Sequence, residues 1–178
     1  MKNIALAKSM NYGVFLGLML IGISVIAYVA GLKTGDSINA WSGGIVMLVG
    51  VFYFMLRFRN KDNGGFASFG QLFVVGFLTL LIAIIISSVY SYVFLTYINP
   101  EAVDEIKQVT YDRYISSGMS QEEAIKSMKM AEPFMTPLFT SLMAIVIYGF
   151  VGAGLGAIYG LILKKADPNP FRELDADV

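Results

Sequence analysis

Four long runs without a charged residue constrain the fold of this chain more than any other feature. They extend from Ser9 to Leu32, Ser37 to Leu56, Asn63 to Pro100, and Pro133 to Leu163. A helix rises about 1.5 Å per residue, so about 20 apolar residues cross the ~30 Å hydrocarbon layer of a bilayer. Each run is long enough for one such helix. We therefore expect an all-α, integral membrane four-helix bundle.

The spans are expected to form a single membrane domain over residues 1–178. Their predicted bounds are about 9–32, 37–56, 69–98 and 137–163. Gly35 and Asp36 leave room for only a short turn after the first span, because glycine favours tight turns. We expect the first two spans to be antiparallel neighbours.

Local signals set the ends of the last two spans. Ser68 is a suitable N-cap for the third span. The pair Asn99-Pro100 ends that span, since the residue before proline resists helical geometry. Thr136 is the expected N-cap of the fourth span, with Pro137 in its first turn, where a missing N–H has no cost.

The connection from residue 100 to 132 is the only sizeable segment expected outside the membrane. Apolar residues recur near helical spacing at Val103, Ile106 and Val109. Gly118 interrupts this pattern, and Ser120 with Glu123 forms a capping box that predicts a second helix. We expect an extracytoplasmic amphipathic helical hairpin that lies over the bundle and rests its apolar face on the membrane surface or on the helix ends.

Composition excludes several classes of function. The chain has no Cys and no His, which removes thiol nucleophiles, imidazole bases and the usual zinc ligands. Its 13 acidic and 13 basic residues cancel, so no basic surface is expected to bind nucleic acid. The spans contain no charged residue of the kind that marks a proton relay or a buried active site. We expect a protein that is not an enzyme, with no catalytic residue, cofactor or metal.

The charges of the connections predict the orientation, because Lys and Arg near helix ends stay in the cytoplasm. Three segments carry this basic excess: the N-terminus with Lys2 and Lys8, the second connection with Arg57, Arg59 and Lys61, and the C-terminal segment with Lys164 and Lys165. The connection from 100 to 132 is more acidic than basic. We expect a multi-pass protein of the bacterial inner membrane with both termini in the cytoplasm.

Glycines at four-residue spacing mark a candidate helix-packing face. Gly152, Gly156 and Gly160 lie on one face of the fourth span, and Gly13 and Gly17 repeat the spacing in the first. Glycine lets two helix backbones approach closely. We expect the two sets to pack against each other, and the alternatives are a homodimer contact or a ligand groove.

The second connection holds a candidate lipid site. Arg57, Arg59 and Lys61 precede Gly64 and Gly65, and guanidinium groups bind phosphate oxygens in a bidentate fork. The alternative is that these residues only anchor the helix end on the cytoplasmic side. Either role makes membrane lipids the expected contacts.

Two motifs carry a resemblance to a known family. They are the stretch Asn-Gly-Gly-Phe-Ala-Ser-Phe-Gly-Gln at residues 63–71 and the junction Tyr-Ile-Asn-Pro-Glu at 97–101. With them, the whole chain resembles a bacterial membrane family, the domain of unknown function 4199. The resemblance implies a four-helix inner-membrane protein and brings no activity, cofactor or catalytic residue with it.

Three functions remain open from the sequence. The first is a non-enzymatic structural or interaction protein that packs against itself or a membrane protein partner. The second is an accessory subunit of a membrane lipid-linked glycosyltransferase system, in which the basic cluster contacts polyprenyl phosphate. The third is a subunit of a small transporter or channel, although the uncharged spans offer no ion site.

Overall fold

The computed structural model describes residues 2–32 and 37–167, and these residues form helices joined by short connections. The α-helices are α1 (Lys2–Val29), α2 (Ser37–Arg57), α3 (Phe69–Val93), α4 (Ala102–Ser116), α5 (Gln121–Ala131) and α6 (Pro137–Leu163). Two π-helical segments, η1 (Phe58–Asp62) and η2 (Phe94–Ile98), continue α2 and α3, and a 3₁₀ turn, η3 (Glu132–Phe134), precedes α6. The predicted all-α class is confirmed. The expected turn at Gly35 and Asp36 lies outside the described residues.

Four of these helices are long and apolar enough to cross a membrane. The segments are Ile4–Val29, Trp41–Asp62, Phe69–Ile98 and Pro137–Leu163. The third and fourth have the predicted bounds. The first begins earlier than expected and the second ends later, because α1 and α2–η1 continue as helix through charged residues at one end of the bundle.

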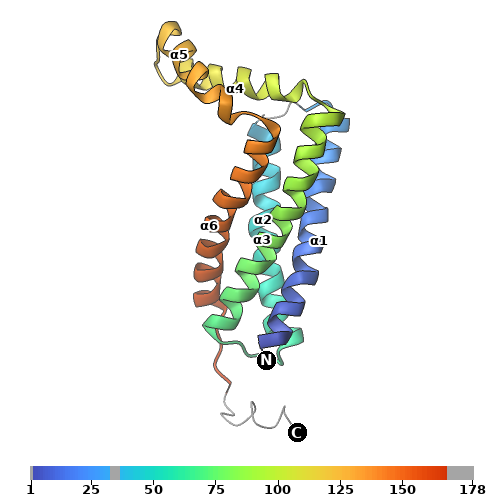
Figure 1. The fold of residues 1–178 in the computed structure, drawn as a ribbon. Coiled ribbons are helices and arrows are strands. Elements are labelled where there is room, and N and C mark those ends of the chain that lie inside the picture. The colour runs from blue at the N-terminus through green and yellow to red at the C-terminus, as the bar shows by residue number, and fades with distance from the viewer. Residues whose placement is uncertain (1, 33–36, 168–178) are drawn as a thin grey trace.

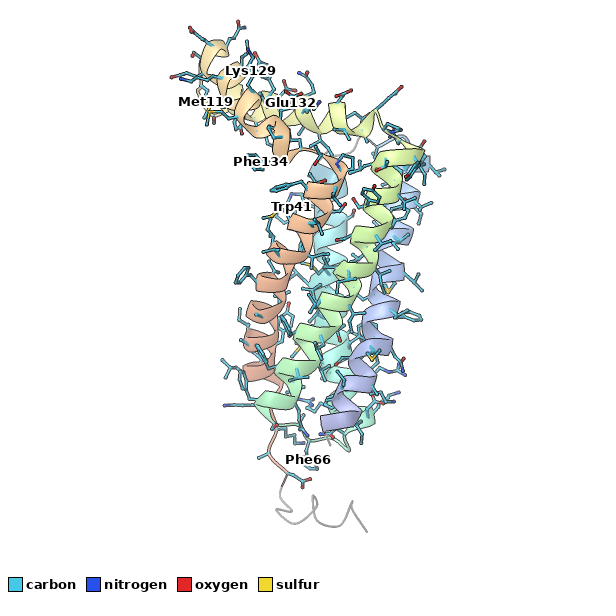
Figure 2. All side chains as sticks on the ribbon, viewed as in Figure 1. Trp41, Phe66, Met119, Lys129, Glu132 and Phe134 are labelled. Atoms are coloured by element: carbon cyan, nitrogen blue, oxygen red, sulfur yellow. The ribbon has the colours of Figure 1, made fainter. Side chains whose placement is uncertain are left out.

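The four long helices lie side by side, with α3 between α1 and α6 (Figure 1). The start of α1 and the end of α6 lie at the same end of the bundle, which we call the terminal end (Figure 1). Helices α4 and α5 lie at the opposite end, the hairpin end. Trp41 lies toward the hairpin end and Phe66 at the terminal end (Figure 2), as expected for aromatic residues at two headgroup levels.

Helix α3 forms the centre of the core. Its side chains Leu72, Val75 and Leu80 are fully buried, as are Leu16 of α1 and Met55 of α2. In a bilayer the hydrophobic effect does not draw helices together, so close van der Waals packing around α3 holds the bundle.

Side-chain caps begin the last two spans as the sequence predicts. The hydroxyl of Ser68 accepts a hydrogen bond from the backbone N–H of Gln71, whose side chain accepts in return from the N–H of Ser68. Thr136 accepts from the N–H of Phe139, and Pro137 occupies the first turn of α6. Both predicted caps are confirmed.

The hairpin also forms, with α4 crossing the end of the bundle and α5 lying beyond α6 (Figure 1). The first turn of α4 packs on η2 through Ala102, which is buried in one hydrophobic cluster with Phe94 and Leu95. Gly118 turns the chain with φ +95°, and the predicted capping box of Ser120 and Glu123 is present. The hairpin is thus fixed to the bundle at the base of α4.

Candidate functional site

The glycines of α1 lie against α3. A Cβ added at Gly13 would come within 2.6 Å of the Ile82 Cβ, and one at Gly17 within 3.1 Å of the Ala83 carbonyl oxygen. Any larger side chain would push α1 away from α3. Both positions therefore set the distance between these two helices.

The glycines of α6 also lie against α3, on its other side. A Cβ at Gly156 would lie 3.1 Å from the Phe73 carbonyl oxygen and 3.3 Å from the Phe77 backbone nitrogen. Gly152 faces Leu80, and Gly160 faces the ring of Phe69. We call this contact the α3–α6 seam, defined by Gly152, Gly156 and Gly160.

The expectation that these glycines pack against the first span is therefore wrong. Spacing in the sequence shows that one face of a helix consists of small residues, but it does not show which helix packs against that face. Helix α3 offers Gly76 opposite Gly156, so both backbones can approach at this point. Because α3 covers the three seam glycines, they do not form an open face for a second copy of the chain.

Helices α1 and α2 do not close in this way. Gly50 of α2 meets Leu16 of α1, and the rings of Tyr12 and Phe54 stack with centroids 4.7 Å apart. Outside this contact a groove of about 730 Å³ remains between the helices. We call it the charged groove.

The walls of the charged groove are apolar and exposed at the bundle surface. Its apolar lining comes from both helices: Phe15 and Met19 from α1, and Ile45, Val46, Val49, Gly50 and Phe54 from α2. Phe15 and Val49 are 63% and 62% exposed. In a membrane, this part of the groove contacts hydrocarbon.

The terminal end of the same groove is polar and charged. Lys8 Nζ lies 2.6 Å from Asp62 Oδ1, and the hydroxyl of Tyr12 donates a hydrogen bond to the other carboxylate oxygen. The guanidinium of Arg57 interacts with the hydroxyls of Tyr53 and Tyr12. Two cations thus stand against one carboxylate, which leaves one positive charge in excess.

The three basic residues predicted to contact lipid phosphate separate in the structure. Arg57 lines the charged groove. Arg59 instead donates a hydrogen bond from Nη1 to the carbonyl oxygen of Leu163, at 3.1 Å, and so holds the end of α6. Lys61 is exposed and does not line the groove.

A backbone pairing completes the terminal end of the bundle. Ala67 and Lys165 exchange two N–H···O=C bonds of 3.0 Å each, and the Lys165 ammonium lies 5.1 Å above the ring of Phe66. With the contact of Arg59, these bonds fasten the segment after α6 to the connection before α3. The groove lies apart from this fastening, beside α1.

Sequence reasoning missed Lys8, Tyr12 and Asp62 as members of the site. Asp62 is the single acidic residue in a basic connection, and this is the one feature of the sequence that could have marked it as a site residue. It reaches α1 because η1 continues α2 by five residues beyond Arg57. The groove therefore combines a positively charged end, which can bind the headgroup of a lipid, with apolar walls, which can contact the lipid chain. Within the described ranges, no three acidic side chains are close enough to hold a metal ion.

The fold and this groove define a class: four-span helical membrane proteins with an amphipathic groove at one end of the bundle. A family model described as "Protein of unknown function (DUF4199)" matches residues 11–165, and the chain belongs to this family. Searches of curated proteins and of solved structures gave no match.

Proposed function

We propose that this protein is a non-enzymatic integral membrane protein that binds an anionic lipid in the charged groove between α1 and α2. The observation that carries the proposal is the position of Arg57 and Lys8 at one end of an apolar groove that opens on the bundle surface. Hydrocarbon will fill the apolar part in any membrane. The charged end is what selects one headgroup over another.

The length of the groove fits one lipid chain. From Arg57 to Ile45 the helix rises by roughly 18 Å. One leaflet of a bilayer contributes about half of the ~30 Å hydrocarbon layer. A lipid with its headgroup at Arg57 would therefore extend its chain along Val49 to the level of Ile45, near the middle of the membrane.

The charges fit a phosphate. Arg binds phosphate oxygens through a planar fork, and the hydroxyls of Tyr53 and Tyr12 lie close to the Arg57 guanidinium. Lys8 is 41% exposed and keeps donors free for a headgroup while it pairs with Asp62. The net positive charge favours an anionic headgroup over a zwitterionic one.

A non-catalytic role fits the chemistry of these residues. The sequence has no His or Cys to act as base or nucleophile. The carboxylate of Asp62 is engaged by Lys8 and Tyr12. Such a site holds and orients a headgroup.

We further propose that the terminal end faces the cytoplasm of a bacterial cell, which places the charged groove in the inner leaflet of the inner membrane. Lys and Arg gather at this end, as the positive-inside rule predicts. Both termini would then be cytoplasmic.

A second candidate is an accessory subunit of a lipid-linked glycosyltransferase system. It is favoured by the same geometry, because a polyprenyl phosphate also joins a phosphate to a long apolar chain. Its added prediction is tighter binding of polyprenyl phosphate than of an anionic diacyl lipid.

The test is native mass spectrometry of the purified protein with defined lipids. Phosphatidylglycerol, phosphatidylcholine and polyprenyl phosphate are added separately to wild type, Arg57→Gln and the control Lys61→Gln. The control removes the same charge from the same connection but outside the groove. Arg57→Gln is expected to lower the fraction with bound phosphatidylglycerol about five-fold, since one basic residue near a membrane contributes about 1 kcal/mol.

Equal loss in Lys61→Gln would show only general attraction between charges. Equal binding of phosphatidylcholine and phosphatidylglycerol to wild type would contradict the headgroup selection. Either result would remove the basis of the proposed function.

A further inference from the structure

A second cavity, of about 330 Å³, lies at the hairpin end between α1, α3 and α6, with Ile106 of α4 beside it. We call it the hydroxyl chamber. Its lining includes six hydroxyl groups, from Ser24, Tyr28, Ser87, Tyr90, Ser91 and Thr140. No charged side chain is among its lining residues. Its volume is at the lower end of the range for small-molecule sites.

One of these hydroxyls lacks a partner. The Oγ of Ser87 is buried without a hydrogen bond. Serine and threonine in helices usually satisfy themselves on the carbonyl four residues earlier. Ser9 does so on Ala5 at 2.6 Å, and Thr140 does so on Thr136 at 2.9 Å. Ser87, in contrast, leaves its hydroxyl unpaired beside a cavity. A buried hydroxyl without a partner destabilises the fold, and a hydrogen bond from a ligand would offset this loss of free energy.

The chamber also has an aromatic wall. The ring of Phe94 lies between Tyr28, with centroids 5.1 Å apart, and Tyr90, with centroids 5.8 Å apart. This places flat apolar surface beside the hydroxyls of Ser87 and Ser91. A ligand with an apolar face and several hydroxyl groups satisfies both kinds of surface.

We propose that the hydroxyl chamber binds a neutral polyol, either the sugar headgroup of a membrane glycolipid or a free sugar. A charged ligand would find no counter-ion among the lining residues, and an unpaired buried charge is costly. The site shares no residue with the charged groove and lies at the opposite end of the bundle. It is therefore independent of the proposed function.

The experiment uses the full chain in nanodiscs of phosphatidylcholine. The discs contain either monoglucosyl diacylglycerol or diacylglycerol, and a third sample receives free glucose. Wild type is compared with Ser87→Ala and with the control Ser88→Ala, a buried neighbour in α3 that does not line the chamber. The readouts are the melting temperature and the fraction of protein with bound lipid after gentle release.

We expect monoglucosyl diacylglycerol, but not diacylglycerol, to raise the melting temperature of wild type and Ser88→Ala. Ser87→Ala is expected to bind it about five-fold less, the loss typical of one neutral hydrogen bond. Without sugar, Ser87→Ala is expected to be at least as stable as wild type, because it removes an unpaired buried hydroxyl. An equal effect of free glucose would show that the ligand of the chamber is a soluble sugar and not a glycolipid headgroup.

The proposal is overturned if the two lipids bind equally and glucose has no effect, since the chamber would then not recognise a sugar. It is also overturned if Ser87→Ala and Ser88→Ala bind the sugar equally, because the unpaired hydroxyl would then have no part in recognition.

Discussion

The α3–α6 seam and the α1–α2 interface are both lined mainly by apolar side chains, yet only at the seam do the two helices close on each other. At the seam, Gly156 faces Gly76 and the backbones meet. Between α1 and α2 the close approach is at Gly50, and a groove of about 730 Å³ remains beside it. Small residues repeated on facing helices close an interface, whereas a single glycine leaves space between bulky neighbours.

The largest effect is expected from filling the closed interface. Gly156→Leu would place a side chain against the Phe73 and Phe77 backbone, which cannot move aside without shifting α3. We expect a loss of roughly 3 kcal/mol or more in the free energy of unfolding, measured by thermal denaturation in detergent.

The control for this substitution is Gly154→Leu, because nothing lies within 4 Å of a Cβ at Gly154. Equal stability of the two variants would contradict the seam. The wild type and both variants should also have the same oligomeric state, since α3 already covers Gly156.

Filling the open interface is expected to change lipid binding and leave the fold intact. Val49→Trp places a large ring in the charged groove. It should lower the binding of phosphatidylglycerol about tenfold, because the lipid chain loses the apolar surface that it contacts. Ile158→Trp on α6 is the matched control, since Ile158 is 55% exposed and Val49 is 62% exposed. Native mass spectrometry of the two variants measures the difference. A similar loss in both would mean that the lipid is not in the groove.

Removing the carboxylate of the groove should strengthen the binding of an anionic lipid, whereas removing its arginine should weaken it. Asp62→Asn raises the net charge of the cluster by one unit, so phosphatidylglycerol is expected to bind up to about five-fold more tightly. A lipid titration followed by native mass spectrometry measures this change. Weaker binding would show that Asp62 is needed to position Lys8 and Arg57, and that its charge is not what limits affinity.

The smallest effect is expected in the hairpin, away from both interfaces. The backbone N–H and hydroxyl of Ser120 donate to the Glu123 carboxylate and hold the pKa of that carboxyl below its ordinary value. The ionised form therefore stabilises the start of α5 above the ordinary pKa of about 4.3, and this contribution is lost as the pH falls through the lowered pKa.

Amide hydrogen exchange in residues 121–131 measures this loss between pH 7 and pH 3, after correction for the intrinsic rate. The first turn of α5 should lose protection on acidification in wild type and in Glu122→Gln. Glu123→Gln should already have the lower protection at pH 7. An unchanged α5 in Glu123→Gln at pH 7 would contradict the role of the capping box.

Much of the fold could be predicted from the sequence, because each signal there is local. The charge-free runs gave the four spans, and Ser68, Thr136 and Ser120 marked helix starts that the structure confirms. The pairing of the helices could not be predicted this way. Gly13 and Gly156 each belong to a set of glycines at four-residue spacing, and only the packing shows that both contact α3.

The candidate site was predicted in part for the same reason. Arg57 stood out as a basic residue at a helix end, but its separation from Arg59 depends on which way each side chain leaves the helix. The pair of Lys8 and Asp62 joins residues far apart in the chain. Their meeting depends on the register of α1 against η1, which no local pattern encodes.

Whether an anionic lipid occupies the charged groove is tested most directly by photo-crosslinking with an anionic lipid whose chain carries a photoreactive group. The protein is irradiated in nanodiscs and the labelled peptides are identified by mass spectrometry. We expect labelling to concentrate on the groove residues Phe15, Met19, Ile45 and Val49. Arg57→Gln should reduce this labelling, and Lys61→Gln should not. Labelling spread equally over these residues and the exposed α6 residues Ile158 and Ile162 would contradict this expectation.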